Sequence, residues 1–290
     1  MLEIIENKIF VDNLLRTTYK EILENIDVMN GDIIYLGGSL IEGHINKYSI
    51  GMGNPYSDID VFVVRDHQDF ITSKGEYVEG VRKTSFCKAN NINLDVEIYD
   101  KNYVNLLSNV LSNLRIEKDK RVLNILKENL ETGNDFDFVN EFLTRFLYSI
   151  CIKNCDLYCE IKNGYNFRAF LELKKVWLLN SIDSISEDVR GNLLIKQATT
   201  ALYTFRQLLD TVMEFIIATE GVMIDRSKWI HLKFDNLVKS TNKYNGIHQI
   251  YLYFFRGELE NDKATLEKIN TFFSVLRKEI EIITLGELYI

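Results

Sequence analysis

The segment DIIYLGGSLIEG, residues 32–43, changes within a few positions from bulky apolar residues to small ones. Its first part, DIIYL at 32–36, is rich in β-branched and aromatic side chains, which is typical of a strand. Gly37, Gly38 and Ser39 follow directly, and glycine permits the sharp turn with which such a strand ends. A helix that begins here would direct free backbone N–H groups outward, toward phosphate oxygens. The segment predicts a strand, a turn and a phosphate-binding helix start, although such turns are also common without a ligand.

A second strand is predicted at 58–64, where the sequence reads DIDVFVV. Because residues i and i+2 of a strand share a face, the carboxylates of Asp58 and Asp60 point the same way. Two such groups repel each other unless a cation lies between them. Hard oxygen ligands suit Mg²⁺, and a pair of Mg²⁺ ions stabilises both ends of a displacement at phosphorus. The alternative is a solvated strand edge, which the apolar run at 61–64 disfavours because it indicates a strand entering a core.

A further acidic pair lies on another predicted strand, INLDVEIY at 92–99. Asp95 and Glu97 share one face of that strand, and a neighbouring strand lies about 4.8 Å away. One of these carboxylates can therefore join Asp58 and Asp60, either to hold a metal ion or to take the proton from an attacking hydroxyl. Only one of the two is needed, and the other is then a solvated strand end.

Together these motifs resemble the pattern of the DNA polymerase β-like nucleotidyltransferase superfamily. The matching elements are the apolar strand followed by GSLIEG at 38–43, the run SDID at 57–60 and the distant Asp95. Locally, PYSDID at 55–60 is similar to the P-Y-S-D-I-E of antibiotic nucleotidyltransferases of the kanamycin type. The resemblance covers about 65 residues well. Its motifs are specific for the superfamily, but they do not identify a substrate.

Two details refine this resemblance. LDVEIYDKNYVNLL at 94–107 is similar to the kanamycin-type strand in which the first acid is catalytic, which favours Asp95 over Glu97. Eighteen residues separate Ser39 from Asp58, more than the family usually has. The extra length falls in HINKYSIGMGN, which either changes the loop near the triphosphate or recognises the acceptor.

The resemblance implies an α+β fold, with a small mixed-sheet catalytic domain followed by an all-helical domain. It implies an enzyme that binds ATP or another NTP with two Mg²⁺ ions and holds the β,γ-phosphates on Gly38 and Ser39. Asp58 and Asp60 would bind the metal ions, and Asp95 would ligate the second metal and act as base. A hydroxyl of a small acceptor, such as an aminoglycoside or a biosynthetic intermediate, would attack the α-phosphorus. AMP would be transferred and pyrophosphate released.

Charge is distributed unevenly along the chain. Residues 1–100 contain nine Lys or Arg and seventeen Asp or Glu, so they carry the whole formal charge of −8. An acidic region suits metal ions or a cationic substrate, and the lack of basic excess argues against nucleic acid as a partner. Cations for a triphosphate are therefore expected from elsewhere, at Lys174 in FLELKKVWLL and Lys233 in RSKWIHLKF. The alternative for each is a cation in solvent on a helix whose aromatic residues lie in the core.

Proline is almost absent from the chain. Average usage would give about 15 prolines, but there is one, Pro55. Because proline breaks helices, its scarcity favours long helices. Pro55 stands three residues before Asp58, where its fixed φ would help to set the entry to the metal-binding strand.

The sequence changes in character after the first hundred residues, where long stretches with helical periodicity begin, among them 139–152. We therefore predict a nucleotidyltransferase catalytic domain at 1–100 and a helical substrate-binding domain at 101–290. Within the first domain a leading helix is expected at 10–28 and a further strand at 76–86.

Composition and cysteine pattern bear on the cellular location. With 46% hydrophobic and 26% charged residues, the chain has an ordinary globular composition, which excludes collagen-like or largely disordered chains. No apolar run reaches the roughly 18 residues that span a bilayer, and the N-terminus lacks the order of a signal peptide. Cys151, Cys155 and Cys159 recur every four residues, which predicts one helical stripe of reduced thiols. These features favour a cytoplasmic protein with no membrane contact; a homodimer is implied by the resemblance alone.

Three other functions stay open. A synthase of cyclic or linear oligonucleotide signals would use another nucleotide as the acceptor. Transfer of the nucleotide to a protein or an RNA is a further alternative, and RNA is disfavoured because the helical domain has no basic excess. A catalytically silent nucleotide-binding module is disfavoured because all three acids of the motif are present.

Overall fold

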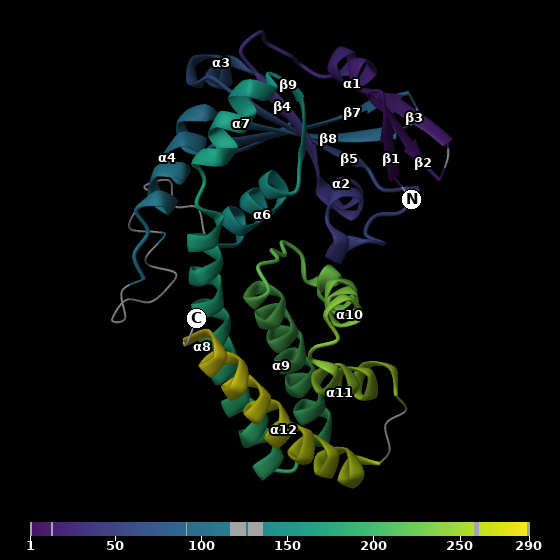
Figure 1. Ribbon diagram of the computed structural model, residues 1–290, viewed down its shortest axis with the longest axis vertical. Coiled ribbons are helices and arrows are strands. Elements are labelled where there is room, and N and C mark those ends of the chain that lie inside the picture. The colour runs from purple at the N-terminus through teal and green to yellow at the C-terminus, as the bar shows by residue number, and fades with distance from the viewer. Residues whose placement is uncertain are drawn as a thin grey trace. The chain divides into compact units, whose positions relative to one another are not determined.

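The structure is a computed structural model (Figure 1). It describes residues 2–12, 14–90, 92–116, 126, 136–257 and 261–288. The chain divides into two compact units. One consists of Met1–Leu173 with Ile224–Arg226, and the other of Lys174–Met223 with Ser227–Ile290.

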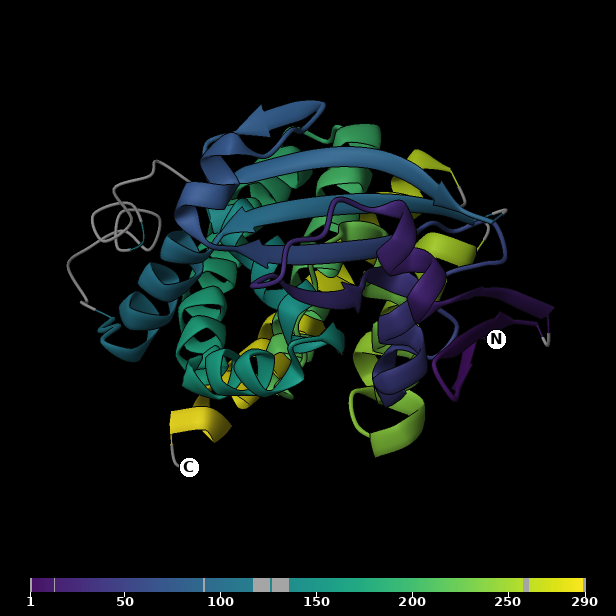
Figure 2. The same cartoon turned by 90° about the horizontal axis from the view of Figure 1, so that it is seen from above.

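The first unit is built on a six-stranded sheet with the order β6-β7-β8-β5-β4-β9. β5 and β8 run parallel, whereas the other neighbouring pairs in this order are antiparallel (Figure 2). The strands are β4 (Ile33–Gly37), β5 (Ile59–Arg65), β6 (Tyr77–Glu79), β7 (Arg82–Ala89), β8 (Ile92–Asp100) and β9 (Ile150–Lys153). The mixed sheet, together with the helical second unit, confirms the predicted α+β class.

Short helices connect the strands of the first unit. They are α1 (Tyr19–Asn25), α2 (Gly38–Ile45), η1 (Lys47–Ser49), α3 (His67–Thr72), α4 (Lys101–Ser112), α6 (Phe136–Leu147) and α7 (Cys155–Gly164). The predicted strands at 32–36, 58–64 and 92–99 are confirmed within one residue at each end as β4, β5 and β8. The single strand expected at 76–86 is instead the hairpin of β6 and β7.

Alternate residues of the central strands reach two different layers. One face is apolar and packs against the N-terminal strands, α1 and α2. The opposite face carries Tyr35, Phe62 and Tyr99, whose rings pack together and against aromatic residues of α6. Asp60 and Asp95 have the same strand parity as Phe62 and Tyr99, so these acids lie on the aromatic face.

The first residues form a three-stranded antiparallel sheet. Its strands are β1 (Leu2–Ile5), β2 (Lys8–Val11) and β3 (Leu14–Thr18). The predicted helix at 10–28 is therefore wrong over its first half. Glu6 and Asn7, both with positive φ, form the two-residue turn that matches the twist of a hairpin. Helix α1 begins only after Thr18, because Thr18 and Glu21 form a capping box that fixes its first turn.

The compact unit around the sheet extends past residue 100, the predicted end of the catalytic domain, to Leu173. The helix expected at 139–152 ends at Leu147, and β9 follows and pairs with β4 as the sheet's last strand. Phe142 and Phe146 of α6 cover the aromatic face of the sheet. β9 and α6 therefore belong to the first unit, whose continuous part ends at Leu173.

The three closely spaced cysteines lie on two different elements. Cys151 lies on β9, whereas Cys155 and Cys159 lie on α7. The predicted single helical stripe of three thiols is therefore wrong. None of the four cysteines forms a disulfide, and Cys155 and Cys159 are exposed.

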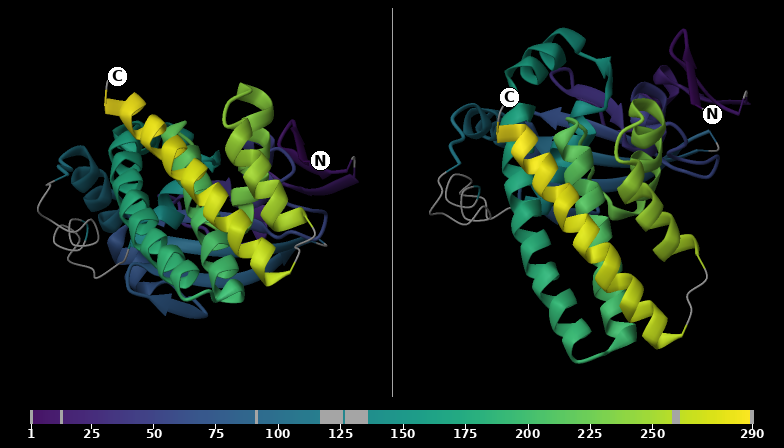
Figure 3. Two further views of the ribbon diagram at one scale, coloured as in Figure 1. Left: turned by 90° about the horizontal axis from the view of Figure 1, so that it is seen from below. Right: turned by 60° about the horizontal axis from the view of Figure 1, so that its bottom comes forward.

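The second unit is helical throughout the part that the structure describes (Figure 3). Its elements are the greater part of α8 (Phe167–Leu194), α9 (Ala198–Thr219), η2 (Ser227–Trp229), α10 (Ile230–Thr241), α11 (Asn245–Arg256) and α12 (Asp262–Leu288). α9 packs against α10, α11 and α12, and the absence of proline after Pro55 agrees with the length of these helices. Among the described helices, none combines the length and apolar character needed to cross a membrane.

Candidate active site

Three acidic residues lie where β5 and β8 begin. Asp60 on β5 is aligned with Asp95 on β8 in the parallel pairing, and Asp58 directly precedes β5. Asp60 is also aligned with Gly37, the last residue of β4. Asp60 and Asp95 are thus neighbours across two strands beside the glycine turn, and Asp58 is two residues before Asp60.

The glycine turn lies directly against Asp60. Gly38 begins α2 with a φ of +77°, and a Cβ at this position would lie 1.7 Å from Oδ2 of Asp60. Only glycine leaves room for that carboxylate and adopts this φ without strain. Ser39 follows in the first turn of α2, and Gly37 at the N-cap has no side chain to accept from the first N–H groups. The helix start therefore presents backbone donors next to a carboxylate.

Burial perturbs two of the three carboxylates. Desolvation raises the pKa of Asp60 to about 7; the charge of Arg145 opposes this rise, and the charge of Glu97 adds to it. Burial, and then the charge of Asp58, raises the pKa of Asp95 above its usual range. Within the described part of the chain, no group donates a hydrogen bond to any of the three aspartates. Carboxylates that are desolvated and lack donors favour a nearby cation.

Glu97 has hydrogen-bond and ion-pair partners that Asp95 lacks, although both lie on the same face of β8. Nη1 of Arg145 is 2.7 Å from Oε1 of Glu97, and the hydroxyl of Tyr99 donates to Oε2 at 2.6 Å. Arg82 lies on the other side, with Nη1 3.6 Å from Oε2. The charge of Glu97 is therefore neutralised within the protein, whereas Asp95 has no hydrogen bond or ion pair with a described residue.

Arg145 is the charged residue of this site that the sequence does not reveal. It is almost completely buried on α6, and its guanidinium carbon lies 5.8 Å from the centre of the Phe62 ring. It also pairs with Glu141 and with Asp225, the latter with 3.4 Å between Nε and Oδ2. Burial lowers the pKa of Arg145, but the facing carboxylates, Glu97 first, raise it more. A permanent positive charge therefore lies behind the acidic residues.

The two lysines predicted to bind the nucleotide lie in the second unit. Nζ of Lys174 is 2.8 Å from Oε1 of Glu214, and Nζ of Lys233 donates to the backbone oxygen of Met223 at 2.7 Å. Both side chains are almost completely buried. Their ammonium groups thus have partners within the helical unit, and their contact with a nucleotide stays a prediction.

A rigid turn leads into the segment that contains Asp58 and Asp60. The N–H of Ser57 donates to the backbone oxygen of Asn54 at 2.9 Å, and the N–H of Tyr56 donates to Oδ1 of Asn54 at 2.8 Å. Pro55 occupies the second position of this turn, where its fixed φ is already suitable. Asp58 comes directly after the turn, as the position of the only proline suggests.

The donor set of the site fits Mg²⁺ bound together with a substrate. Carboxylate oxygens are hard ligands, and Mg²⁺ is usually held by one or two carboxylates plus phosphates and water. Across the described residues, no group of three or more His, Cys, Asp or Glu side chains is already arranged to hold a metal ion. Asp58, Asp60 and Asp95 therefore offer separate ligands rather than a closed protein cage.

Comparisons with known proteins add little to this geometry. No family model matches the chain, and a search of curated proteins finds no significant match. Among solved structures, the chain is similar to a nucleotidyltransferase-like protein from Exiguobacterium sibiricum 255-15, with 12% identity and a TM-score of 0.37. The similarity covers 75% of this chain and 62% of the other, so it spans less than two thirds of that protein's length. We therefore argue the function from the residues of the site itself.

Proposed function

We propose that this chain is a Mg²⁺-dependent nucleotidyltransferase that moves a nucleoside monophosphate, AMP from ATP in the simplest case, to a hydroxyl of a small molecule. The observation that carries the proposal is the state of Asp60. Its carboxylate is partly buried, receives no hydrogen bond from the described residues, and lies against Gly38 at the start of α2. Asp95 faces it from the neighbouring strand. This arrangement supports the binding of a cation and a phosphate side by side.

The start of α2 would bind the phosphates of the nucleotide. The backbone N–H groups of its first turn have no intrahelical acceptor, and the helix dipole favours negative charge there. Gly38 allows a phosphate to approach the backbone closely, and the Ser39 hydroxyl can donate one more hydrogen bond.

The acids would divide the remaining tasks. Asp58 and Asp60 would hold Mg²⁺, which when bound neutralises the triphosphate and stabilises the charge on the leaving group. Asp95 would contribute to the same site and accept the proton of the acceptor hydroxyl, because its raised pKa suits a proton acceptor better than an ordinary carboxylate does. The acceptor oxygen then bonds to the α-phosphorus while the bond to the bridging oxygen breaks, and pyrophosphate leaves.

Arg145 supports these roles without a need to contact the substrate. Its charge opposes the effect of burial on Asp60 and so favours the ionised carboxylate that a cation needs. Its pairing with Glu97 also keeps that glutamate from competing for the same cation. Both effects follow from the single position of Arg145 on α6.

The test compares Asp60→Asn with Asp66→Asn, which removes an exposed carboxylate of the same unit that pairs with Lys101. Two quantities are measured: the Mg²⁺-dependent binding of α,β-methylene-ATP by calorimetry, and pyrophosphate release from each NTP with a panel of hydroxyl acceptors. We expect Asp60→Asn to weaken binding at least about tenfold and to reduce pyrophosphate release about 100-fold or more, while Asp66→Asn behaves as wild type.

Two results would overturn the proposal. One is a folded Asp60→Asn variant that binds and turns over the nucleotide as the wild type does. The other is a wild-type protein that binds no nucleotide in the presence of Mg²⁺.

A further inference from the structure

A hollow of about 350 Å³ opens at the end of the sheet where β5 and β8 begin. Its lining residues are Arg16, Pro55, Tyr56, Ser57, Asp58, Ile92 and Asn93. All of them belong to the first unit, and Asp58 connects the hollow to the acidic residues of the candidate active site. The volume falls at the lower end of the range of small-molecule pockets, about 300–1,000 Å³.

Arg16 is the cation of this hollow. It lies on β3, its Nε is buried, and no described residue accepts a hydrogen bond from that nitrogen or forms an ion pair with the side chain. A buried donor without an acceptor costs about 1–3 kcal/mol, and more when the group is charged. Arg16 as a whole is half-buried and lines the hollow, so an anionic group there would pair with its guanidinium, which forms two parallel hydrogen bonds with a carboxylate or phosphate.

Tyr56 gives the hollow a flat apolar surface. Its side chain is 93% exposed, which is unusual for a large ring held on an ordered turn. The turn is fixed at both ends, because the N–H of Asn54 donates to Oγ of Ser57 at 3.0 Å and the N–H of Ser57 donates back to the Asn54 oxygen. The ring is thus presented beside Asp58 on a backbone that need not be ordered on binding, which reduces the entropic cost of stacking a ligand ring on it.

The charge of Arg16 argues against a polycationic ligand in this hollow. The net charge of residues 1–100 alone favours a cationic acceptor such as an aminoglycoside, but Arg16 would repel an ammonium group placed next to it. A ligand that pairs with Arg16 carries negative charge, and a ligand that stacks on Tyr56 contains a flat ring. Asp58 also lines the hollow, and Mg²⁺ held there in the proposed function would offset its charge, so that Arg16 decides which charge of acceptor is favoured.

We propose that this hollow is the acceptor subsite of the proposed transferase, and that it takes an acceptor with a flat ring and an anionic group, a phosphate or a carboxylate. This inference rests on the proposed function, in which the start of α2 holds the donor nucleotide. The acceptor then lies on the side of Asp58 and Asn93, at the entrance to β5 and β8, and presents its hydroxyl toward the acids.

The test uses 4-fluorophenyl phosphate as the probe and follows its ¹⁹F signal by NMR, with Mg²⁺ and α,β-methylene-ATP at saturation. We expect binding in the millimolar range, where dissociation constants of about 1 mM correspond to small fragments. Arg16→Gln should weaken this binding at least about fivefold, whereas Arg16→Lys should restore part of it. Arg115→Gln, at an exposed arginine of the same unit, is the matched control and should have no effect. The cationic analogue 4-fluorobenzylamine should bind more weakly than the phosphate.

Each other outcome decides against the assignment. Equal binding to wild type and Arg16→Gln, absence of binding to wild type, or tighter binding of the cationic analogue would overturn it. Probe binding that is present without nucleotide and lost when α,β-methylene-ATP is added would show that Arg16 serves the donor instead. If Asp60→Asn leaves Mg²⁺-dependent nucleotide binding unchanged while Arg16→Gln weakens probe binding, the proposed function fails and the hollow remains as an anion-and-ring site.

Discussion

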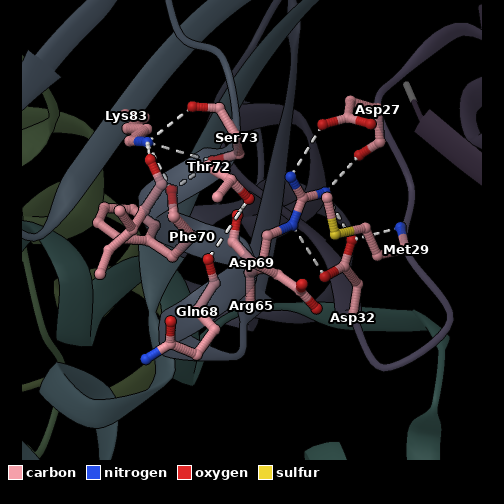
Figure 4. A network of polar contacts seen from close by, with 11 residues as sticks. Asp27, Met29, Asp32, Arg65, Gln68, Asp69, Phe70, Thr72, Ser73 and Lys83 are labelled. Carbon is pink, nitrogen blue, oxygen red and sulfur yellow. Dashed lines mark hydrogen bonds and ion pairs between the residues drawn. The ribbon is translucent and has the colours of Figure 1, made fainter.

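β5 carries a charged side chain near each end, fully buried at Arg65 and partly buried at Asp60, and only one of the two is paired. At the last residue, Arg65 is fully buried and donates to both carboxylate oxygens of Asp32 at 3.0 and 2.7 Å. It also donates to Oδ2 and to the backbone oxygen of Asp27, each at 2.8 Å (Figure 4). At the second residue, Asp60 receives no hydrogen bond from any described residue.

Buried charges elsewhere in this unit are surrounded by hydrogen-bond partners. Lys83 on β7, in the same view, donates to the backbone oxygens of Ile71 at 3.1 Å and of Ser73 at 2.7 Å, and also to that of Phe70 (Figure 4). Charges of this kind are surrounded by partners, as buried charges in stable proteins usually are. Asp60 is only partly buried and has no such partners among the described residues, and it lies at the end of the strand beside the glycine turn, where a ligand could reach it.

The largest expected change in stability comes from breaking the paired end of the strand. Arg65→Met would leave the buried carboxylate of Asp32 without its partner, and we expect the free energy of unfolding to fall by about 3–5 kcal/mol. Lys101→Met, which removes an ion pair between Lys101 and Asp66 at the surface, should cost less than about 1 kcal/mol. Urea denaturation measures both. If both variants lose less than about 1 kcal/mol of unfolding free energy, Arg65 is not a buried charge that depends on its partners.

At the unpaired end, a substitution should stabilise the metal-free protein. Burial raises the pKa of Asp60 from 3.8 to about 7 in the folded state. Below about pH 4 both states carry the proton, between about pH 4 and 7 only the unfolded chain loses it, and above about pH 7 the full penalty is present. The free energy of unfolding of the wild type therefore falls across this window as pH rises.

Asp60→Asn removes this penalty, which is at most about 4 kcal/mol. In EDTA, the variant should match the wild type near pH 4 and exceed it by roughly 2–4 kcal/mol at pH 8. Added Mg²⁺ should stabilise the wild type at pH 8 and leave the variant unchanged, which serves as the control. A variant that is less stable than wild type at pH 8 in EDTA would show that Asp60 is paired after all.

Gly38→Ala tests whether the close approach of the turn to Asp60 matters. The new Cβ would overlap Oδ2 of Asp60, and a positive φ adds strain, so a loss of about 1–3 kcal/mol and a loss of Mg²⁺-dependent nucleotide binding are expected. Gly80→Ala is a matched control, because Gly80 also has a positive φ, +56°, but a Cβ there meets nothing within 4 Å. Both variants are measured by urea denaturation and by calorimetry. Equal nucleotide binding in both would contradict the assigned role of Gly38.

The smallest effect is expected at Pro55. Pro55→Ala relaxes the unfolded chain and the turn from Asn54 to Ser57, which should cost about 0.4–1 kcal/mol of stability. The rate of pyrophosphate release should fall by a larger factor than this loss of stability alone would cause, because the turn positions Asp58. Parallel measurement of pyrophosphate release and urea denaturation checks this, and equal loss of both would refute it.

The parts of the fold that could be predicted from the sequence are those with local signals. The strand before the glycine turn and the two acidic strands have short apolar or alternating runs, and β4, β5 and β8 lie where these runs are. The meeting of Asp60 with Asp95 follows from strand parity together with one parallel pairing. These features need only residues that are close in sequence or share a regular period.

The parts that could not be predicted depend on contacts distant in sequence. Arg145 lies in RFL, a segment with helical periodicity and no motif, and its role appears only when α6 covers the sheet beside Glu97. Arg16 was included in an expected helix, because the hairpins before it depend on residues with positive φ such as Asn7 and Asp12. The sequence around Lys174 and Lys233 indicates that each is a cation beside aromatic residues. It does not reveal that Glu214 and the backbone oxygen of Met223 are their partners in the fold.

In the proposed function, Asp60 lacks a protein partner because it binds a divalent cation together with the nucleotide. The most direct measurement titrates Mn²⁺, a paramagnetic substitute for Mg²⁺ at oxygen-ligand sites, into wild type and Asp60→Asn in the presence of α,β-methylene-ATP. Electron paramagnetic resonance reports the bound fraction. We expect wild type to bind Mn²⁺ and Asp60→Asn to bind it at least about tenfold more weakly. Equal Mn²⁺ binding by the two folded proteins would show that Asp60 is not a ligand of the cation.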